Sequence, residues 1–163
     1  MAKQTPKTNV IRHLEAAGIP FSFREFDVSA GIPSGVEMAA ILGQDPDYVF
    51  KTLVTQGAGG GHYVFVIPVA ASLNLKKAAK AAGEKSIEMI RQAQLLPLTG
   101  YVHGGCSPVG MKKPFTTVFH ETAAALDTIM VSAGRIGCQV QCRPADLLAL
   151  LGAGTADIIA DER

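Results

Sequence analysis

Two apolar runs, at residues 48–55 and 62–69, constrain the fold more than any other feature of the sequence. They read YVFKTLVT and HYVFVIPV, and β-branched and aromatic residues at this density favour extended strands. The segment GAGGG at residues 57–61 is expected to form a flexible turn, so the two runs predict a β-hairpin. Both faces of the first run are largely apolar, which predicts that the hairpin is covered on both sides.

The rest of the sequence predicts short helices and further strands. Thr5-Pro6 has the form of a helix start and Gly18 that of a helix end, while Ser34-x-x-Glu37 has the form of a capping box. The predicted helices cover residues 5–18, 34–43, 73–82 and 144–151, and Ser86 is expected to cap one more, with Ile87, Ile90 and Ala93 on its apolar side. The further strands are expected at residues 20–26, 115–119, 128–132 and 137–142.

These elements predict an α+β protein. Hairpins without a regular alternation of strand and helix favour a mixed, largely antiparallel sheet. A sheet of about six strands on so short a chain is expected to curl into a barrel-like form with flanking helices. The length of 163 residues allows one sizeable core, and no linker or internal repeat interrupts the sequence, so we expect a single domain over residues 1–163.

The charge balance bears on the class of partner. Fifteen Lys and Arg residues against 14 Asp and Glu residues give a net charge of +1. This argues against a general nucleic-acid coat protein, and we expect no DNA partner. Five lysines form local basic groups, namely Lys76, Lys77, Lys80, Lys112 and Lys113. They are either a solvated surface or contacts to RNA phosphates, and the sequence leaves both interpretations open.

Compartment and cofactors are inferred from what the sequence lacks. No run approaches the ~20 apolar residues of a membrane-spanning helix, and residues 1–18 lack the apolar stretch of a secretion signal. We therefore expect a cytoplasmic protein without membrane contacts. Cys106, Cys138 and Cys142 show no zinc spacing and are expected to be reduced thiols. The histidines are scattered, so neither a metal nor another cofactor is expected.

Lys51 is the residue most suggestive of chemistry, because it interrupts an apolar strand. A lysine at the centre of such a strand either extends its ammonium group to an edge or stands in the wall of a cavity. In the second case its charge would hold an anion or a developing negative charge. The strand pattern alone favours the first interpretation and leaves the second open.

The turn-rich segment at residues 100–113 is the second candidate. Gly104-Gly105 allows the backbone to approach a ligand closely, and its N–H groups would suit an oxyanion hole. The alternative is an ordinary connection, in which Ser107 and the following proline fix a bend. Cys106, three residues after His103, raises the further possibility of a thiol nucleophile, although closeness in sequence shows neither a base nor a lowered pKa.

Taken together, four motifs resemble one known family. PDYVFKTLV, PVAASLNLKKAAKAAG, TGYVHGGCSPVGMKK and the IMVSAG strand occur in this order from about Val10 to about Ile159. They are similar to the YbaK-type deacylases, which are free-standing relatives of the editing domain inserted in bacterial prolyl-tRNA synthetase. The resemblance implies a mixed barrel with flanking helices.

The resemblance also implies roles for individual residues. Lys51 matches the family's essential lysine and Thr52 its neighbour, while Gly104 matches the glycine whose backbone lines the site and Ser132 a pocket serine. With Gly105 and Ser107 of the loop, these residues are expected to form the site. Two positions depart from the pattern: Phe26 stands where better-known members have tyrosine, and Gln139 where they have aspartate. We expect both to contact the substrate and to bear on its selection.

The activity that the resemblance implies is hydrolysis of mischarged tRNA, with cysteine on tRNA(Pro) as the substrate and prolyl-tRNA synthetase as a second partner. The substrate's own thiol would attack its ester carbonyl and leave as a cyclic thiolactone, so the protein would position and polarise the ester without a cofactor. Two alternatives stay open at this point. One is removal of alanine or another small residue from tRNA by a bound water, and the other is a non-catalytic module that binds tRNA or the synthetase.

Overall fold

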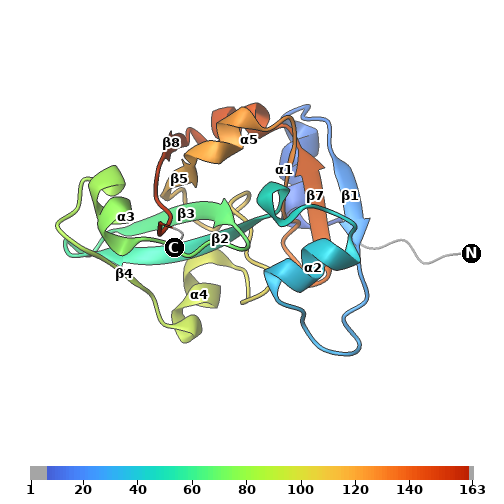
Figure 1. Ribbon diagram of the computed structural model, residues 1–163, viewed down its shortest axis with the longest axis horizontal. Coiled ribbons are helices and arrows are strands. Elements are labelled where there is room, and N and C mark those ends of the chain that lie inside the picture. The colour runs from blue at the N-terminus through green and yellow to red at the C-terminus, as the bar shows by residue number, and fades with distance from the viewer. Residues whose placement is uncertain (1–6, 162–163) are drawn as a thin grey trace, which may run out of the picture.

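The computed structural model describes residues 7–161 and contains two sheets surrounded by short helices (Figure 1). The helices are α1 (Asn9–Ala16), α2 (Gly35–Ile41), α3 (Leu75–Ala82), α4 (Gln92–Thr99) and α5 (Pro144–Leu151), with 3-10 turns η1 (Pro46–Tyr48) and η2 (Glu121–Ala125). The strands are β1 (Ser22–Glu25), β2 (Phe50–Gly57), β3 (His62–Pro68), β4 (Ile87–Met89), β5 (Thr116–His120), β6 (Ile129–Ser132), β7 (Cys138–Cys142) and β8 (Gly154–Ala156).

The predicted hairpin is confirmed and forms the centre of the larger sheet. Strands β2 and β3 pair antiparallel from Phe50 opposite Pro68 to Gln56 opposite His62. The sheet has the order β4-β2-β3-β5-β8, in which β5 runs parallel to both β3 and β8. The prediction of a mixed sheet is therefore correct.

The second sheet is small and antiparallel, with the order β1-β7-β6. It meets the larger sheet at a single bridge, between Val49 and Met130. The α+β class is confirmed, but the two sheets do not close into a barrel. A closed barrel needs every strand paired on both sides, whereas β4 and β8 are the two edges of the larger sheet and β1 is an edge of the smaller one.

The hairpin is covered on both faces, as the sequence predicts. Phe50 and Val54 point into the main core, which lies between the two sheets and also takes in α1 and α5. Phe65 and Ile67 point to the opposite face, where the small side chains of α3 pack on the sheet. A third cluster joins α2 to the bridge between the sheets through Met38, Ala39, Val49 and Met130. None of the described helices is long and apolar enough to cross a membrane.

Most helix boundaries follow their capping residues. Ser34 and Glu37 form the predicted capping box at the start of α2, with both hydrogen bonds present. Thr5-Pro6 lies outside the described residues. Within them, α1 starts after Thr8, whose side chain accepts a hydrogen bond from the N–H of Ile11. Gly18 follows the helix with φ +69°, as expected for a residue that ends a helix.

One predicted helix begins in the wrong place, and two strands, β4 and β8, are missing from the predictions. Ser86 does not cap a helix, because residues 87–89 form β4, which pairs antiparallel with the end of β2. The free edge of the hairpin offers these residues main-chain hydrogen bonds, and Ile87 is buried there. Strand β8 has only three residues, which is too short for a recognisable alternation of apolar and polar side chains. It forms by parallel pairing with β5, which local sequence does not indicate.

Candidate active site

A cavity of about 250 Å³ lies where the two sheets separate. It is lined by residues from the start of β2, the end of β6, the start of β7, helix α2 and the loop after α4. The lining residues include Phe26, Ile32, Met38, Lys51, Thr52, His103, Gly104, Cys106, Ser132, Ile136 and Gln139. Six of the expected site residues therefore meet in one place together with His103 and Cys106, although they come from positions 26 to 139 of the chain.

Lys51 stands in the wall of this cavity and is half-buried. Within residues 7–161, no hydrogen bond or ion pair engages its ammonium group. Burial lowers the pKa of Lys51 from its ordinary value of 10.5, because desolvation disfavours the charged form. An unpaired cation beside a cavity is placed to bind a partly negative oxygen of a ligand.

Gly104 contributes backbone to the same cavity. Its φ of +90° lies in a region that residues with a side chain rarely adopt, so glycine is required by conformation here. A Cβ at this position would lie 3.5 Å from Ile32 and Ile136, which is ordinary contact. Gly104 is exposed and its N–H has no partner among the described residues, so this donor is accessible to a ligand oxygen.

Gly105 does not share this role. Its N–H donates to the carbonyl of Val102 at 3.0 Å, so it is not free to act as an oxyanion donor. A Cβ on Gly105 would lie 3.0 Å from the backbone nitrogen of Ile136, which shows how tightly the loop packs on residues 135–136. The structure places Gly105 behind the cavity wall, where its small size permits close packing.

Ser107 and Ser132 both hold the loop in shape. Ser107 is fully buried outside the cavity lining, and its Oγ accepts a hydrogen bond from the N–H of Val109 at 3.3 Å. Ser132 does line the cavity, but its hydroxyl is already engaged. It donates to the carbonyl of Gly105 at 2.9 Å and accepts from the N–H of Gly134 at 3.1 Å. Ser132 thus fastens the loop to the end of β6 at the residue next to Gly104.

Thr52 and Gln139 differ from the serines because each has a buried oxygen without a hydrogen-bond partner. Gln139 lies on the central strand of the small sheet, opposite Ser132 of β6 and Arg24 of β1. Phe26, just beyond the end of β1, completes this part of the wall. The two departures from the family pattern therefore both face the cavity.

Cys106 lines the cavity but lacks the properties of an activated nucleophile. Its side chain is buried, and burial raises the pKa of its thiol to about 12. The only hydrogen bond that lowers this pKa comes from Thr99, so no described histidine acts as its base. His103 also lines the cavity, but it is exposed.

None of the five lysines of the basic groups lines this cavity. Lys76 and Lys80 are exposed on α3, which lies at the opposite end of the molecule from α2 in Figure 1. Lys77 is engaged in the fold: its ammonium donates to Asp157, to Asp161 and to the carbonyl of Ile159 at 2.9–3.0 Å. Lys77 therefore anchors residues 157–161 and is not a free contact for a phosphate.

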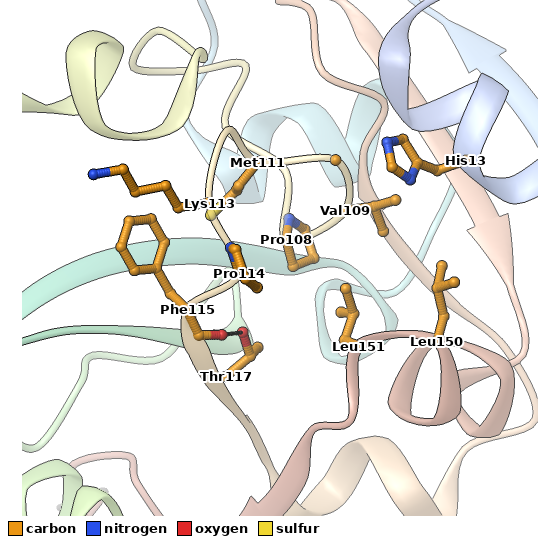
Figure 2. A pocket seen from close by; sticks show the side chains of 11 residues that line it. His13, Pro108, Val109, Met111, Lys113, Pro114, Phe115, Thr117, Leu150 and Leu151 are labelled. Atoms are coloured by element: carbon orange, nitrogen blue, oxygen red, sulfur yellow. Dashed lines mark hydrogen bonds between the residues drawn. The ribbon is translucent and has the colours of Figure 1, made fainter.

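Lys112 and Lys113 are both exposed at the end of the loop. Lys113 stands at a second cavity of about 240 Å³, shown in Figure 2. This cavity lies on the other half of the same loop and is lined by His13, Pro108, Val109, Met111, Pro114, Phe115, Thr117, Leu150 and Leu151, among others. Apart from His13, Lys113 and Thr117, these side chains are apolar. The hydroxyl of Thr117 is satisfied, because it donates to the carbonyl of Phe115 at 3.0 Å.

Sequence reasoning missed the contribution of residues 32–38 to the first cavity. Ile32, Pro33 and Met38 line it together with the capping residue Ser34. The capping box marked this segment as a helix start, but nothing in the local pattern indicates that it lies against Gly104, about seventy residues later. Ile32 is 58% exposed beside this cavity, which only the structure shows.

Comparison with known proteins gives a consistent result. The chain matches the family described as the aminoacyl-tRNA editing domain over residues 30–150. It is 42% identical to EbsC of Enterococcus faecalis over 160 residues, which cover 98% of both chains, and the name of that protein proposes a Cys-tRNA(Pro)/Cys-tRNA(Cys) deacylase.

Two crystal structures have the same fold over nearly their whole length. One, of a protein described as a candidate trans-editing enzyme for prolyl-tRNA synthetase, has a TM-score of 0.85 and 26% identity and covers 98% of this chain and 100% of its own. The other, hypothetical protein APE2540, has a TM-score of 0.85 and 25% identity, and the match covers 94% of this chain and 100% of that protein's chain. The resemblance read from the four motifs is confirmed, and this chain belongs to the aminoacyl-tRNA editing domain family.

Proposed function

We propose that this chain is a trans-editing hydrolase that removes cysteine from mischarged tRNA(Pro), acting over residues 1–163 as one editing domain. Its partners would be the aminoacyl end of the tRNA and prolyl-tRNA synthetase, which produces the mischarged species. Because charging of tRNA takes place in the cytoplasm, the proposal places the protein there. The substrate is the one proposed in the name of EbsC, to which the chain is 42% identical.

The observation that carries the proposal is the geometry around Lys51. Lys51, an unpaired and half-buried cation, and Gly104, whose N–H has no partner among the described residues, line the same cavity. Together they suit the carbonyl and ribose oxygens of an aminoacyl ester, on which negative charge develops during acyl transfer. The cavity, about 250 Å³, has room for a small aminoacyl group.

The chemistry proposed here uses the substrate's own nucleophile. Cys106 is held as a neutral thiol, and within the described residues no three His, Cys, Asp or Glu side chains gather as a metal site. The cysteine thiol of the ester attacks its carbonyl carbon, a C–S bond forms, and the C–O bond to the ribose breaks. The thiol proton passes to the ribose oxygen, so the products are a thiolactone and tRNA with a free 3′ hydroxyl. The protein would lower the barrier by placing the ester and stabilising the carbonyl oxygen.

A panel of misacylated tRNAs tests this proposal. tRNA(Pro) charged with cysteine, alanine, serine or proline would be incubated with the protein, and loss of the ester and release of thiolactone or free amino acid would be measured. We expect the cysteine ester to be cleaved at least about tenfold faster than the alanine and serine esters, because packing alone discriminates weakly between such small groups. Equal cleavage of serine and cysteine esters would rule out thiol assistance. Faster cleavage of the alanine ester would assign the alternative function, and binding without release would indicate a non-catalytic module.

A further inference from the structure

Two buried oxygen atoms in the candidate site have no hydrogen-bond partner. They are Oγ1 of Thr52 and Oε1 of Gln139, and both residues line the first cavity. Gln139 is only 4% exposed, so solvent does not replace the missing partner. Buried polar side-chain atoms in folded proteins are nearly always hydrogen-bonded, and an exception calls for an explanation in ligand binding or catalysis.

Comparable side chains on the same strands are satisfied. Thr55, three residues beyond Thr52 on β2, donates to the carbonyl of Tyr63 at 2.9 Å. Gln141, two residues beyond Gln139 on β7, donates from Nε2 to Oγ1 of Thr128 at 3.1 Å. These two strands therefore can satisfy threonine and glutamine side chains by ordinary means, and the unsatisfied oxygens coincide with the cavity.

At Gln139 the missing partner must be a hydrogen-bond donor, and the same donor can also satisfy the hydroxyl oxygen of Thr52. The amide Oε1 of Gln139 accepts only, and the hydroxyl oxygen of Thr52 has lone pairs free to accept. A carboxylate or phosphate at this point would bring further lone pairs against Oε1 of Gln139. Beside Lys51 the ligand should instead present an oxygen, because the ammonium group is a hydrogen-bond donor with a positive charge. A ligand that satisfies both parts carries N–H groups at one end and an acyl oxygen at the other.

The α-amino acyl ester of the proposed function has this arrangement. No Asp or Glu lines the cavity, so the amino group would meet neutral oxygens and not a counter-charge. Lys51 is the one lysine or arginine in the lining, and its charge disfavours a second cation close by. The site is thus suited to an amino group in its neutral form, which an α-amino group with an ordinary pKa of about 8 populates in part near neutral pH.

We propose that Gln139 and Thr52 bind the α-amino group of the ester through its N–H hydrogens, and that this contact makes a free amino group a requirement for cleavage. The inference rests on the proposed function and specifies what the site recognises in its substrate. Sites that hydrogen-bond a substrate N–H group reject analogues without it strongly, because the buried acceptors are then left unpaired.

The test compares cysteinyl-tRNA(Pro) with its deamino analogue, 3-mercaptopropionyl-tRNA(Pro), which keeps the thiol and lacks only the amino group. We expect the wild-type protein to cleave the cysteinyl ester at least about a hundredfold faster. In Gln139→Leu this preference should fall to within about tenfold, and Thr52→Val should lower it by a smaller factor. Gln139→Glu, which keeps an acceptor oxygen, should retain most of it. Gln141→Leu removes the same amide outside the cavity and should leave the preference unchanged.

Melting temperatures separate recognition from folding. Because Oε1 of Gln139 is already unpaired, Gln139→Leu should melt no lower than the wild-type protein. Equal cleavage of the two esters by the wild-type protein, or equal loss of preference in Gln141→Leu and Gln139→Leu, would overturn the proposal.

A binding measurement keeps this inference distinct from the proposed function. Calorimetry would compare 3′-deoxy-3′-cysteinylaminoadenosine, an amide that is not hydrolysed, with its deamino form. Tighter binding of the amine by the wild-type protein, lost in Gln139→Leu, would support amino-group recognition even if no ester were cleaved. If Cys-tRNA(Pro) is cleaved but the two amides bind equally, the proposed function stands and amino-group recognition is wrong.

Discussion

The two cavities on either half of the loop at residues 100–113 have nearly equal volumes, about 250 and 240 Å³, but their walls differ in kind. The first has an unpaired lysine, a free backbone N–H and two buried oxygens without partners. The second has mainly prolines and aliphatic side chains, and its threonine is hydrogen-bonded within the chain (Figure 2). Volume alone therefore does not distinguish a site. The unsatisfied polar groups do, because folding leaves them for a ligand to satisfy.

Removing the cation of the first cavity should have the largest effect. We expect Lys51→Ala to lower the rate of Cys-tRNA(Pro) deacylation by about a hundredfold or more, since one lost electrostatic contact to a developing oxyanion typically costs ~3 kcal/mol. The melting temperature should not fall, because the wild-type ammonium has no partner in the described part of the chain. His13→Ala, in the wall of the second cavity, is the matched control and should deacylate normally. Equal losses in the two variants would show that the cavities do not differ in function.

Two side chains outside the loop hold its two halves by hydrogen bonds, and substituting each tests whether the two cavities differ. Ser132 holds Gly105 next to the first cavity, whereas Asn9 donates from Nδ2 to the carbonyl of Gly110 at 2.8 Å in the wall of the second. Ser132→Ala should cost about 1–2 kcal/mol of stability, because it leaves buried backbone groups unpaired. It should also lower kcat by about tenfold as Gly104 loses its position.

Asn9→Ala provides the comparison for that variant. It should destabilise the fold by about 0.5–1 kcal/mol, since one exposed hydrogen bond is lost, and leave kcat unchanged. Denaturant unfolding and single-turnover deacylation measure the two quantities. A matching fall of kcat in Asn9→Ala would mean that the loop behaves as one unit and that its two halves are not independent.

His120 titrates but lines neither cavity, so it separates the effect of pH on the stability of the fold from the effect of pH on the activity of the site. His120 is buried, and its Nδ1 accepts from the N–H of Ile158 at 3.3 Å. Burial lowers the pKa of His120 below its ordinary value of 6.5. The unfolded chain then takes up the proton first, so stability is full above pH 6.5 and declines as the pH falls through the lowered pKa.

His120→Asn keeps an acceptor for the N–H of Ile158 and removes the titration. Melting curves between pH 7.5 and about 5 should therefore decline less steeply in the variant. Rates of deacylation at fixed temperature well below melting should follow the same pH profile in both proteins. An altered activity profile in His120→Asn would show that this group is coupled to the first cavity.

The smallest effect is expected at Cys106. Because its pKa is raised to about 12, the thiol is almost wholly protonated at neutral pH and should react slowly with iodoacetamide. Cys106→Ser should deacylate within about threefold of the wild-type rate, as for a residue that shapes the wall without joining the reaction. Loss of activity in this variant with retained folding would restore the thiol as a nucleophile and remove the need for substrate assistance.

Much of the fold could be predicted from local pattern, and the errors share one cause. The hairpin, the capping box of α2 and the final helix 144–151 were predictable because alternation and capping act over a few residues. Residues 87–89 became a strand and not a helix because the edge of β2 lies beside them. The two sheets do not close into a barrel because, within residues 7–161, they are bridged only between Val49 and Met130. Pairing over long distances overrides local preference in both cases.

The sequence by itself determined which residues have the chemistry: an isolated lysine in an apolar strand, a glycine pair in a turn-rich loop, and the motifs that place the chain in its family. Only the tertiary structure decided which of them share a cavity. It showed that Gly105 has no free N–H, that Ser132 and Lys77 are engaged in the fold, and that Thr52 and Gln139 are not. The reason is physical. Whether a polar group is available to a ligand depends on which partners folding brings within hydrogen-bond distance, and those partners lie far away in the sequence.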